Sequence, residues 1–174
     1  AKFSPVLFPI VGALKNDSYN YQGNTYHLSR HGFARDMEFS HEVTGSNAVT
    51  FKLNHTEETL AKYPFKFELS ISYHLHGASL KCTYKVLNLD TKTMLFSIGG
   101  HPAFAAPLNN QGVYTDYYLQ FNNDDELTYH HIVSNLIADE TTTVDLKDKI
   151  LPLQHELFYG DALVFKNLKS NQIR

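Results

Sequence analysis

The chain has 174 residues, of which 43% are hydrophobic and 19% are charged, and this composition predicts one globular domain. Its formal net charge of −3 offers no positive surface for nucleic acid, and its longest apolar stretch is far shorter than the ~20 residues that cross a bilayer. The single cysteine rules out an internal disulfide, and no basic segment followed by an apolar run opens the sequence. We therefore expect a cytoplasmic protein without nucleic-acid or membrane partners.

The first predicted elements, in chain order, are short strands and one hairpin. Apolar and β-branched residues favour strands at 6–11, 37–41 and 49–53. Between the first two of these, the segment 19–28 is a candidate hairpin. A turn at Gly23-Asn24 would place Tyr21 opposite Tyr26 and would bring their rings together on one face.

Helix signals are scarce, and the best candidate is the segment 54–63. Glu57 and Glu58 fall in its first turn, where acidic side chains stabilise a helix, and Pro64 follows its end. We therefore expect one short helix between the strand at 49–53 and the next hairpin.

The clearest element is an antiparallel hairpin within 65–86. Alternate residues of its first half are apolar, namely Phe65, Phe67, Leu69, Ile71, Tyr73 and Leu75. After the turn the apolar set continues at even positions, namely Leu80, Cys82, Tyr84 and Val86. A two-residue turn at Gly77-Ala78 pairs Leu75 with Leu80, and a glycine in its first position suits a type II′ turn. Because Cys82 lies on the apolar face, we expect it in the core.

The remaining chain continues the same pattern of short strands. They are expected at 94–98, 117–121 and 162–165. Many short strands separated by turn residues are typical of an all-β protein, and we predict a large antiparallel β-sandwich, with a barrel as the alternative.

Two segments interrupt the strand pattern and are candidates for a functional site. They are 30–36, with the sequence RHGFARD, and 99–104, with the sequence GGHPAF. Each places a histidine beside glycine, where a backbone can approach a ligand closely. One such histidine is more often structural or simply exposed than catalytic, and two in one chain favour a site. His74 and His76 share a strand face with other polar residues, so a solvent-facing stripe is preferred to a metal site.

The chain resembles the aldose 1-epimerase (galactose mutarotase-like) family, in particular its LacX-type branch. The segments that carry the resemblance are SPVLFPIVGAL, HGFARDMEF, YPFKFELSISYHL and FSIGGHPAF. The resemblance implies a β-supersandwich whose concave face binds a hexose. It also implies an isomerase that interconverts the α and β anomers by opening and reclosing the sugar ring, with no metal or organic cofactor. The expected partner is a small-molecule sugar, either a hexose or a sugar phosphate.

The resemblance also implies roles for four residues. His101 matches the family's general acid, and His31 matches the second histidine, which hydrogen-bonds the sugar near the reacting centre. Arg35 lies where the branch that epimerises hexose 6-phosphates has an arginine, so either a hydroxyl or a phosphate suits it. Asp161 resembles the aspartate that holds sugar hydroxyls, although a structural turn carboxylate is nearly as good an interpretation.

The family's general base is not found in this sequence. In the family it is a glutamate near the C-terminal end of the domain, whereas no glutamate follows Asp161 and Glu156 matches no family motif. We therefore expect residues 1–174 to form one mutarotase-like sandwich domain, as a central fragment without its first and last strands, and to have little activity alone. The alternative is a non-catalytic carbohydrate-binding or regulatory β-sandwich. The sequence leaves the oligomeric state open.

Overall fold

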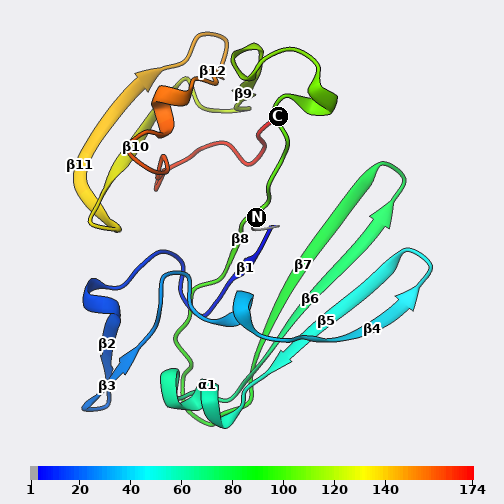
Figure 1. Ribbon diagram of the computed structural model, residues 1–174, viewed down its shortest axis with the longest axis vertical. Coiled ribbons are helices and arrows are strands. Elements are labelled where there is room, and N and C mark those ends of the chain that lie inside the picture. Colours follow the sequence, from blue (N-terminus) through cyan, green and yellow to red (C-terminus); the bar gives the residue numbers. More distant parts are fainter. Residues whose placement is uncertain (1–3) are drawn as a thin grey trace. The chain divides into compact units, whose positions relative to one another are not determined.

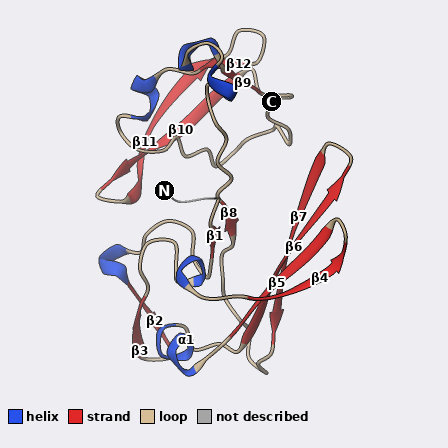
Figure 2. Cartoon of the chain, turned by 45° about the vertical axis from the view of Figure 1, so that its right-hand side comes forward, coloured by secondary structure: helices blue, strands red, loops and turns tan. Residues whose placement is uncertain are grey.

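The computed structural model describes residues 4–174, which form two compact units (Figure 1). The first unit runs through Pro102, and the second unit is Ala103–Arg174. In the described residues every pair of named strands is antiparallel, and the helices are short (Figure 2). The prediction of an all-β protein is therefore confirmed.

The first unit is built around one four-stranded sheet. The strands of the first unit are β1 (Val6–Leu7), β2 (Ser18–Tyr21), β3 (Asn24–His27), β4 (Ser40–Gly45), β5 (Ala48–Asn54), β6 (Phe67–His76), β7 (Ser79–Asn88) and β8 (Gly99–Gly100). Strands β4 to β7 form the sheet in chain order, while β2 pairs with β3 and β1 pairs with β8. The helical segments are η1 (Lys15–Asp17), η2 (Ala34–Asp36) and α1 (Glu57–Lys62).

The second unit consists of two strand pairs. Its strands are β9 (Tyr118–Gln120), β10 (Glu126–Val133), β11 (Leu136–Asp145) and β12 (Ile150–Pro152), and its 3-10 turns are η3 (Leu108–Asn110), η4 (Tyr114–Asp116) and η5 (His155–Phe158). Strand β10 pairs with β11 and β9 pairs with β12. A separate small core of Phe121, Leu127, Leu146 and Leu151 supports this unit.

The hairpin of β6 and β7 confirms the register that the alternation predicts. Leu75 pairs with Leu80 and Leu69 pairs with Val86. Gly77 has a φ of 57°, which a type II′ turn requires at its first central residue and which glycine adopts without strain. Because alternation and turn chemistry agree here, the local sequence was sufficient to define the register.

The predicted register of the hairpin of β2 and β3 was wrong. The turn lies at Gln22-Gly23 instead of Gly23-Asn24, and Tyr19 rather than Tyr21 pairs with Tyr26. Gln22 and Gly23 have φ values of 49° and 80°, as a type I′ turn requires at both central residues. The Tyr19 and Tyr26 rings stack with their centroids 5.4 Å apart, which stabilises this register.

The single strands were predicted with mixed success. Segment 49–53 lies within β5 and segment 117–121 contains β9. The strand expected at 6–11 is limited to β1, and that expected at 37–41 begins only at Ser40. Segment 94–98 forms no strand, and 162–165 contributes one bridge, from Val164 to His130. The long hairpin of β10 and β11 was missed because its alternating residues are largely threonine and charged residues.

The predicted helix is confirmed in type and is shorter than expected. Helix α1 begins after Thr56, whose side chain accepts a hydrogen bond from the Thr59 N–H at 3.2 Å. Thr59 Oγ1 accepts in return from the Thr56 N–H at 2.8 Å. This reciprocal capping box satisfies two N–H groups that an open helix end would leave unpaired.

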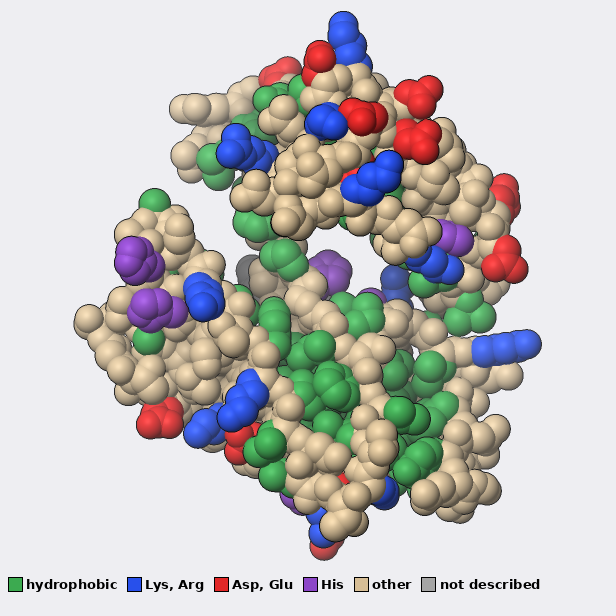
Figure 3. Space-filling view, turned by 180° about the vertical axis from the view of Figure 1, so that it is seen from behind, with side chains coloured by type: hydrophobic (Ala, Val, Ile, Leu, Met, Phe, Trp, Pro, Cys, Tyr) green, Lys and Arg blue, Asp and Glu red, His purple; other side chains and the backbone are tan. Residues whose placement is uncertain are grey.

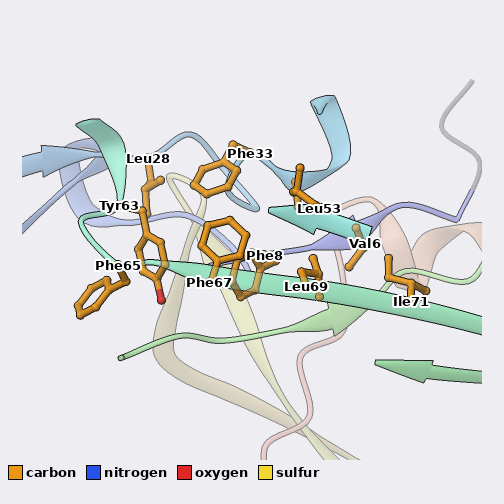
Figure 4. Close-up of a cluster of buried hydrophobic side chains, with 11 residues drawn as sticks. Val6, Phe8, Leu28, Phe33, Leu53, Tyr63, Phe65, Phe67, Leu69 and Ile71 are labelled. Atoms are coloured by element: carbon orange, nitrogen blue, oxygen red, sulfur yellow. The ribbon is translucent and has the colours of Figure 1, made fainter. Parts of the chain in front are cut away.

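The core of the first unit combines aromatic and aliphatic side chains (Figure 4). Phe8, Phe65 and Phe67 are at most 1% exposed, and the Phe8 ring lies 5.0 Å from the Phe67 ring and 6.0 Å from the Tyr63 ring. Phe33, which follows the RHG segment, packs edge-on against Phe8 at 6.3 Å. The loop that carries His31 is therefore anchored to the core through Phe33, two residues later in the chain.

The expectation that Cys82 is buried was wrong. Cys82 is exposed, and its neighbours on the same face, Leu80 and Tyr84, are 60% and 38% exposed. Among the described residues, the side chains on this face are buried near Leu69 of β6, whereas those along β7 are largely exposed to solvent. Apolar side chains also gather on the face of the first unit that Figure 3 shows. Alternation therefore identified the face correctly but not the extent of its covering.

Candidate functional site

His31 occupies a strained turn that is held by backbone contacts. His31 and Gly32 have φ values of 70° and 72°, so two successive residues adopt the left-handed region. A Cβ on Gly32 would lie 2.2 Å from the carbonyl oxygen of Phe8, so only glycine fits there. Left-handed conformations of non-glycine residues are costly and are concentrated at functional sites.

Two hydrogen bonds join His31 to Gly12. The His31 N–H donates to the Gly12 carbonyl at 2.7 Å, and the Gly12 N–H donates to His31 Nδ1 at 3.0 Å. The ring is half-buried and fixed in orientation by a partner 19 residues earlier in the chain.

His101 follows strand β8 and is positioned by its pairing with β1. Gly100 pairs with Val6, and the His101 N–H donates to the Pro5 carbonyl at 3.1 Å. The side chain itself is exposed. The backbone of His101 is therefore held by a strand pair, while its ring is accessible to solvent and to a ligand.

The structure brings His31 and His101 together. Their ring centroids are 6.4 Å apart with an interplanar angle of 76°, an edge-to-face arrangement. The two residues are far apart in the sequence and are held by different backbone contacts. Imidazoles can donate and accept protons near neutral pH, so this pair can hydrogen-bond a polar ligand and transfer a proton to it.

The two glycines before His101 allow a close approach of β8 to its neighbours. A Cβ on Gly100 would lie 2.6 Å from the Tyr84 hydroxyl, and one on Gly99 would lie 3.1 Å from the Val11 side chain. Burial, followed by its hydrogen bond with Cys82, raises the pKa of Tyr84 to about 12. The Tyr84 hydroxyl thus lies beside Gly100, the residue that precedes His101.

Arg35 lies at a pocket of about 450 Å³ in the first unit. The pocket is lined by η2 and its neighbours on one side and by the sheet residues Phe51, Ile71 and Tyr73 on the other. Arg35 Nη2 donates to the Arg30 carbonyl at 2.8 Å. Its Nε is buried, has no hydrogen-bond partner in the described structure, and lies 3.6 Å from Asp36 Oδ2.

Pro5 links this pocket to His101. It lines the pocket and also accepts the hydrogen bond from the His101 N–H. His31 and His101 are themselves not among the residues that line it. The guanidinium and the histidine pair are thus attached to one loop-and-strand framework of the first unit.

Asp161 lies in the second unit. It lines a pocket of about 140 Å³ together with His130, His131 and Glu156. Its φ is 91°, and its Oδ1 accepts a hydrogen bond from the Ala162 N–H at 2.7 Å. A bulge in β10 after His130 interrupts the strict alternation of side chains, and both adjacent histidines line this pocket.

Sequence reasoning missed Gly12 and Tyr84 as parts of the candidate site. Each acts through a contact with a distant residue, Gly12 with His31 and Tyr84 with Gly100. No local pattern reports such a contact. The only available signal was the glycine in SPVLFPIVGAL, a segment that already carried the family resemblance.

Neither a metal site nor a membrane span is evident between residues 4 and 174. No group of three or more His, Cys, Asp or Glu side chains there is arranged to hold a metal ion. No helix in this range is long and apolar enough to cross a membrane.

Comparison with known proteins assigns the family. The family model for aldose 1-epimerase matches residues 1–167. The chain belongs to the aldose 1-epimerase family. The LacX proteins of Lactococcus lactis subsp. lactis, plasmid and chromosomal, are each 37% identical to it over 184 residues. These matches cover 98% of this chain and 60% of each relative, so the chain spans about 60% of their length.

Solved structures of similar proteins confirm the aldose 1-epimerase fold. A galactose mutarotase related enzyme from Lactobacillus acidophilus is 37% identical with a TM-score of 0.89, over 98% of this chain and 56% of that one. A galactose mutarotase-like protein from Lactobacillus casei ATCC 334 is 34% identical with a TM-score of 0.77, over 91% of this chain and 55% of that one. The resemblance to the LacX-type branch is therefore confirmed.

Proposed function

We propose that the protein is an aldose 1-epimerase that interconverts the α and β anomers of a hexose in the cytoplasm. The observation that carries the proposal is the pair of His31 and His101, whose ring centroids are 6.4 Å apart. Membership in the aldose 1-epimerase family supports it. Because this chain spans about 60% of the length of its LacX relatives, the activity is proposed for a form of their length.

In the proposed reaction a base takes the proton from the anomeric hydroxyl while His101 protonates the ring oxygen. The bond between C1 and the ring oxygen breaks, and the electron pair of the deprotonated hydroxyl forms the carbonyl of the open-chain aldehyde. Rotation about the bond between C1 and C2 turns the other carbonyl face toward the ring oxygen, and the reverse transfers close the ring. Each well-placed acid or base contributes about 10²–10⁴ in rate.

We assign the base to no residue of this chain. Glu156 lines the pocket of Asp161 in the second unit but matches no family motif. In the proposal Asp161 binds sugar hydroxyls, and the base is a glutamate outside these 174 residues. The chain alone is therefore expected to catalyse little or no anomer exchange.

Arg35 is proposed to bind the substrate through its guanidinium. The Asp36 carboxylate, 3.6 Å from Arg35 Nε, already supplies a counter-charge, which favours a neutral sugar hydroxyl over a phosphate. We therefore place a free hexose first and a hexose phosphate second.

The variant Arg35→Gln tests whether Arg35 contacts a sugar hydroxyl or a phosphate. If Arg35 contacts a phosphate, the variant weakens binding of glucose 6-phosphate by about 10–100-fold and leaves glucose binding nearly unchanged, because a charged hydrogen bond contributes about 1.5–3 kcal/mol. If it contacts a hydroxyl, both sugars lose affinity equally. Titrations of each sugar against the extended forms of the wild type and the variant distinguish the outcomes.

The function itself is tested by following anomer exchange. NMR exchange spectroscopy or polarimetry on α-glucose, α-galactose and glucose 6-phosphate measures the rate with a form extended at both ends to the length of the Lactococcus relatives. We expect exchange faster than in buffer for at least one sugar. A rate equal to that in buffer for all three would contradict the proposal.

A non-catalytic carbohydrate-binding protein is the second candidate. The observation that favours it is the absence of a glutamate after Asp161 in the sequence. A binder would retain sugar affinity, measured by chemical-shift changes on titration, without accelerating anomer exchange even in the extended form. The enzyme would show both.

A further inference from the structure

We infer that the Gly12 amide fixes His31 as the tautomer with its proton on Nε2, so that His31 acts as a hydrogen-bond donor and Gly12 is a positioning residue. The donor role toward a sugar rests on the proposed function, whereas the tautomer follows from the geometry of the protein alone.

The chemistry of the two groups determines the tautomer. A backbone N–H can only donate, and the Gly12 N–H points at His31 Nδ1 at 3.0 Å. Nδ1 must therefore present its lone pair, and a neutral ring then carries its proton on Nε2. A ring protonated on both nitrogens would set one N–H against another.

The contact is a two-point clamp rather than a single bond. The His31 N–H donates to the Gly12 carbonyl at 2.7 Å, so the same residue pair fixes both the backbone and the ring. The backbone of His31 has a left-handed φ of 70° at this contact. The rotation of the ring and its tautomer are thus determined together.

His130 provides the opposite case within the same chain. Its Nδ1 lies 2.9 Å from the Ala138 carbonyl oxygen, which can only accept. Its proton must therefore be on Nδ1. One chain thus contains two histidines with opposite tautomers, each fixed by a backbone group.

The fixed tautomer limits the roles that His31 can have in the proposed site. Nε2–H of His31 can donate to a substrate oxygen, but it has no lone pair with which to take the anomeric proton. Proton transfer is then left to His101 and to the base. His31 binds an oxygen of the sugar and stabilises negative charge that develops on it.

Gly12 is suited to this role by its backbone conformation. Its φ is 85°, which residues with a Cβ rarely adopt, and a Cβ there would meet no atom within 4 Å. A substitution at Gly12 therefore acts through the backbone torsion that aims the N–H and not through a steric clash.

The tautomers are measured on the 15N-labelled 174-residue chain. Long-range 1H–15N correlation spectra near pH 8, above the ordinary histidine pKa of about 6.5, report which ring nitrogen carries the proton. We expect a single Nε2–H tautomer for His31 and a single Nδ1–H tautomer for His130. A His31 spectrum with the proton on Nδ1, or averaged between both nitrogens, would overturn the inference even if no variant folds.

Gly12→Ala and Gly23→Ala form a matched pair for the role of Gly12. Gly23 has a similar φ, 80°, and equally open space, but it lies in the turn between β2 and β3. We expect Gly12→Ala to move the His31 ring signals toward the averaged position, Gly23→Ala to leave them in place, and Gly12→Asn to restore them, because asparagine tolerates a left-handed φ. Equal shifts of the His31 signals in both alanine variants would contradict a specific role for Gly12.

The outcomes separate this inference from the proposed function. If the extended form fails to accelerate anomer exchange while the expected tautomers are observed, the function alone is refuted. A protein that accelerates exchange with His31 protonated on Nδ1 refutes the positioning role alone.

Discussion

Asp124 is a buried carboxylate that fastens the C-terminal segment of the second unit. It is 4% exposed and accepts hydrogen bonds from the N–H groups of Lys169 and Ser170, at 3.0 and 2.8 Å. A hydrogen bond with the Ser170 side chain has the largest effect on the Asp124 carboxyl, and the two backbone bonds add to it. Together they hold the pKa of Asp124 below its usual range. Replacing it should therefore loosen residues 169–174, in which Ile173 pairs with Phe121 and Arg174 pairs with Gln120 of β9.

We predict that Asp124→Asn lowers the free energy of unfolding by about 1–3 kcal/mol near neutral pH. Because the folded-state pKa is depressed, the stabilisation is complete above the unfolded value of about 3.9 and is lost as the pH falls through the folded value. The difference between the two proteins should therefore shrink in acid. Urea denaturation followed by circular dichroism at neutral and acidic pH measures it.

Asp125→Asn is the matched control for Asp124→Asn. Asp125 is the next residue, and its side chain is 83% exposed and pairs with Lys149 at 2.7 Å on the surface. Exposed ion pairs contribute about 0–1 kcal/mol, so this variant should change stability little. Equal losses in both variants, or a difference that grows in acid, would contradict the account of Asp124.

Cys82 offers a direct test of the uncovered face of β7. Since its side chain is exposed, we predict that a thiol reagent modifies the folded chain without denaturant. The extent of reaction in the folded state should equal that in urea. Reaction only after unfolding would show that this face is covered in solution.

At the scale of single elements, the capping box of α1 makes a quantitative prediction. Thr56→Ala removes the acceptor for the Thr59 N–H and should lower the free energy of unfolding by about 1 kcal/mol. Thr56→Ser keeps a hydroxyl in the same place and should retain most of the stability. Equal destabilisation by both substitutions in urea titrations would show that the hydroxyl does not stabilise the helix.

The elements also show how far local sequence determines structure. The register of the hairpin of β6 and β7 was predicted correctly, although the strands run over 67–88 and not 65–86, because long alternating strands tolerate only one register. The hairpin of β2 and β3 was misplaced, because Gln22 accepts a left-handed φ that its residue type does not signal. The stacking of Tyr19 on Tyr26 stabilises the observed register over the one that a Gly23-Asn24 turn would give.

The candidate site was predictable in its residues but not in its geometry. The motifs RHGFAR and GGHPAF identified His31 and His101, and family resemblance suggested their roles. Their 6.4 Å approach depends on the pairing of β1 with β8 and on contacts of the RHG turn with Gly12 and Phe8. These are tertiary contacts, which no spacing within either motif encodes.

At the scale of the whole molecule, the proposed site residues are divided between the two units. The first unit holds His31, His101 and Arg35, and the second holds Asp161. The LacX relatives are longer, with 60% of their length matched by this chain. The proposal therefore predicts that residues 1–174 bind sugar weakly or not at all and leave anomer exchange at its rate in buffer.

Fast turnover by the 174-residue chain would contradict this expectation and would require a base within it. Glu156, beside Asp161 in the pocket of the second unit, would then be the residue to substitute first. Glu156→Gln would abolish that turnover if it were the base.

The central claim is that His101 is the general acid of an aldose 1-epimerase. The most direct test is the rate of anomer exchange by NMR in the extended form, compared with its His101→Ala and His76→Ala variants. His76 is also exposed, lies at the tip of the hairpin of β6 and β7, and is not part of the proposed site. We predict that His101→Ala lowers the rate by about 10²–10⁴ while His76→Ala leaves it unchanged. A His101→Ala protein that exchanges the anomers at the wild-type rate would contradict the account.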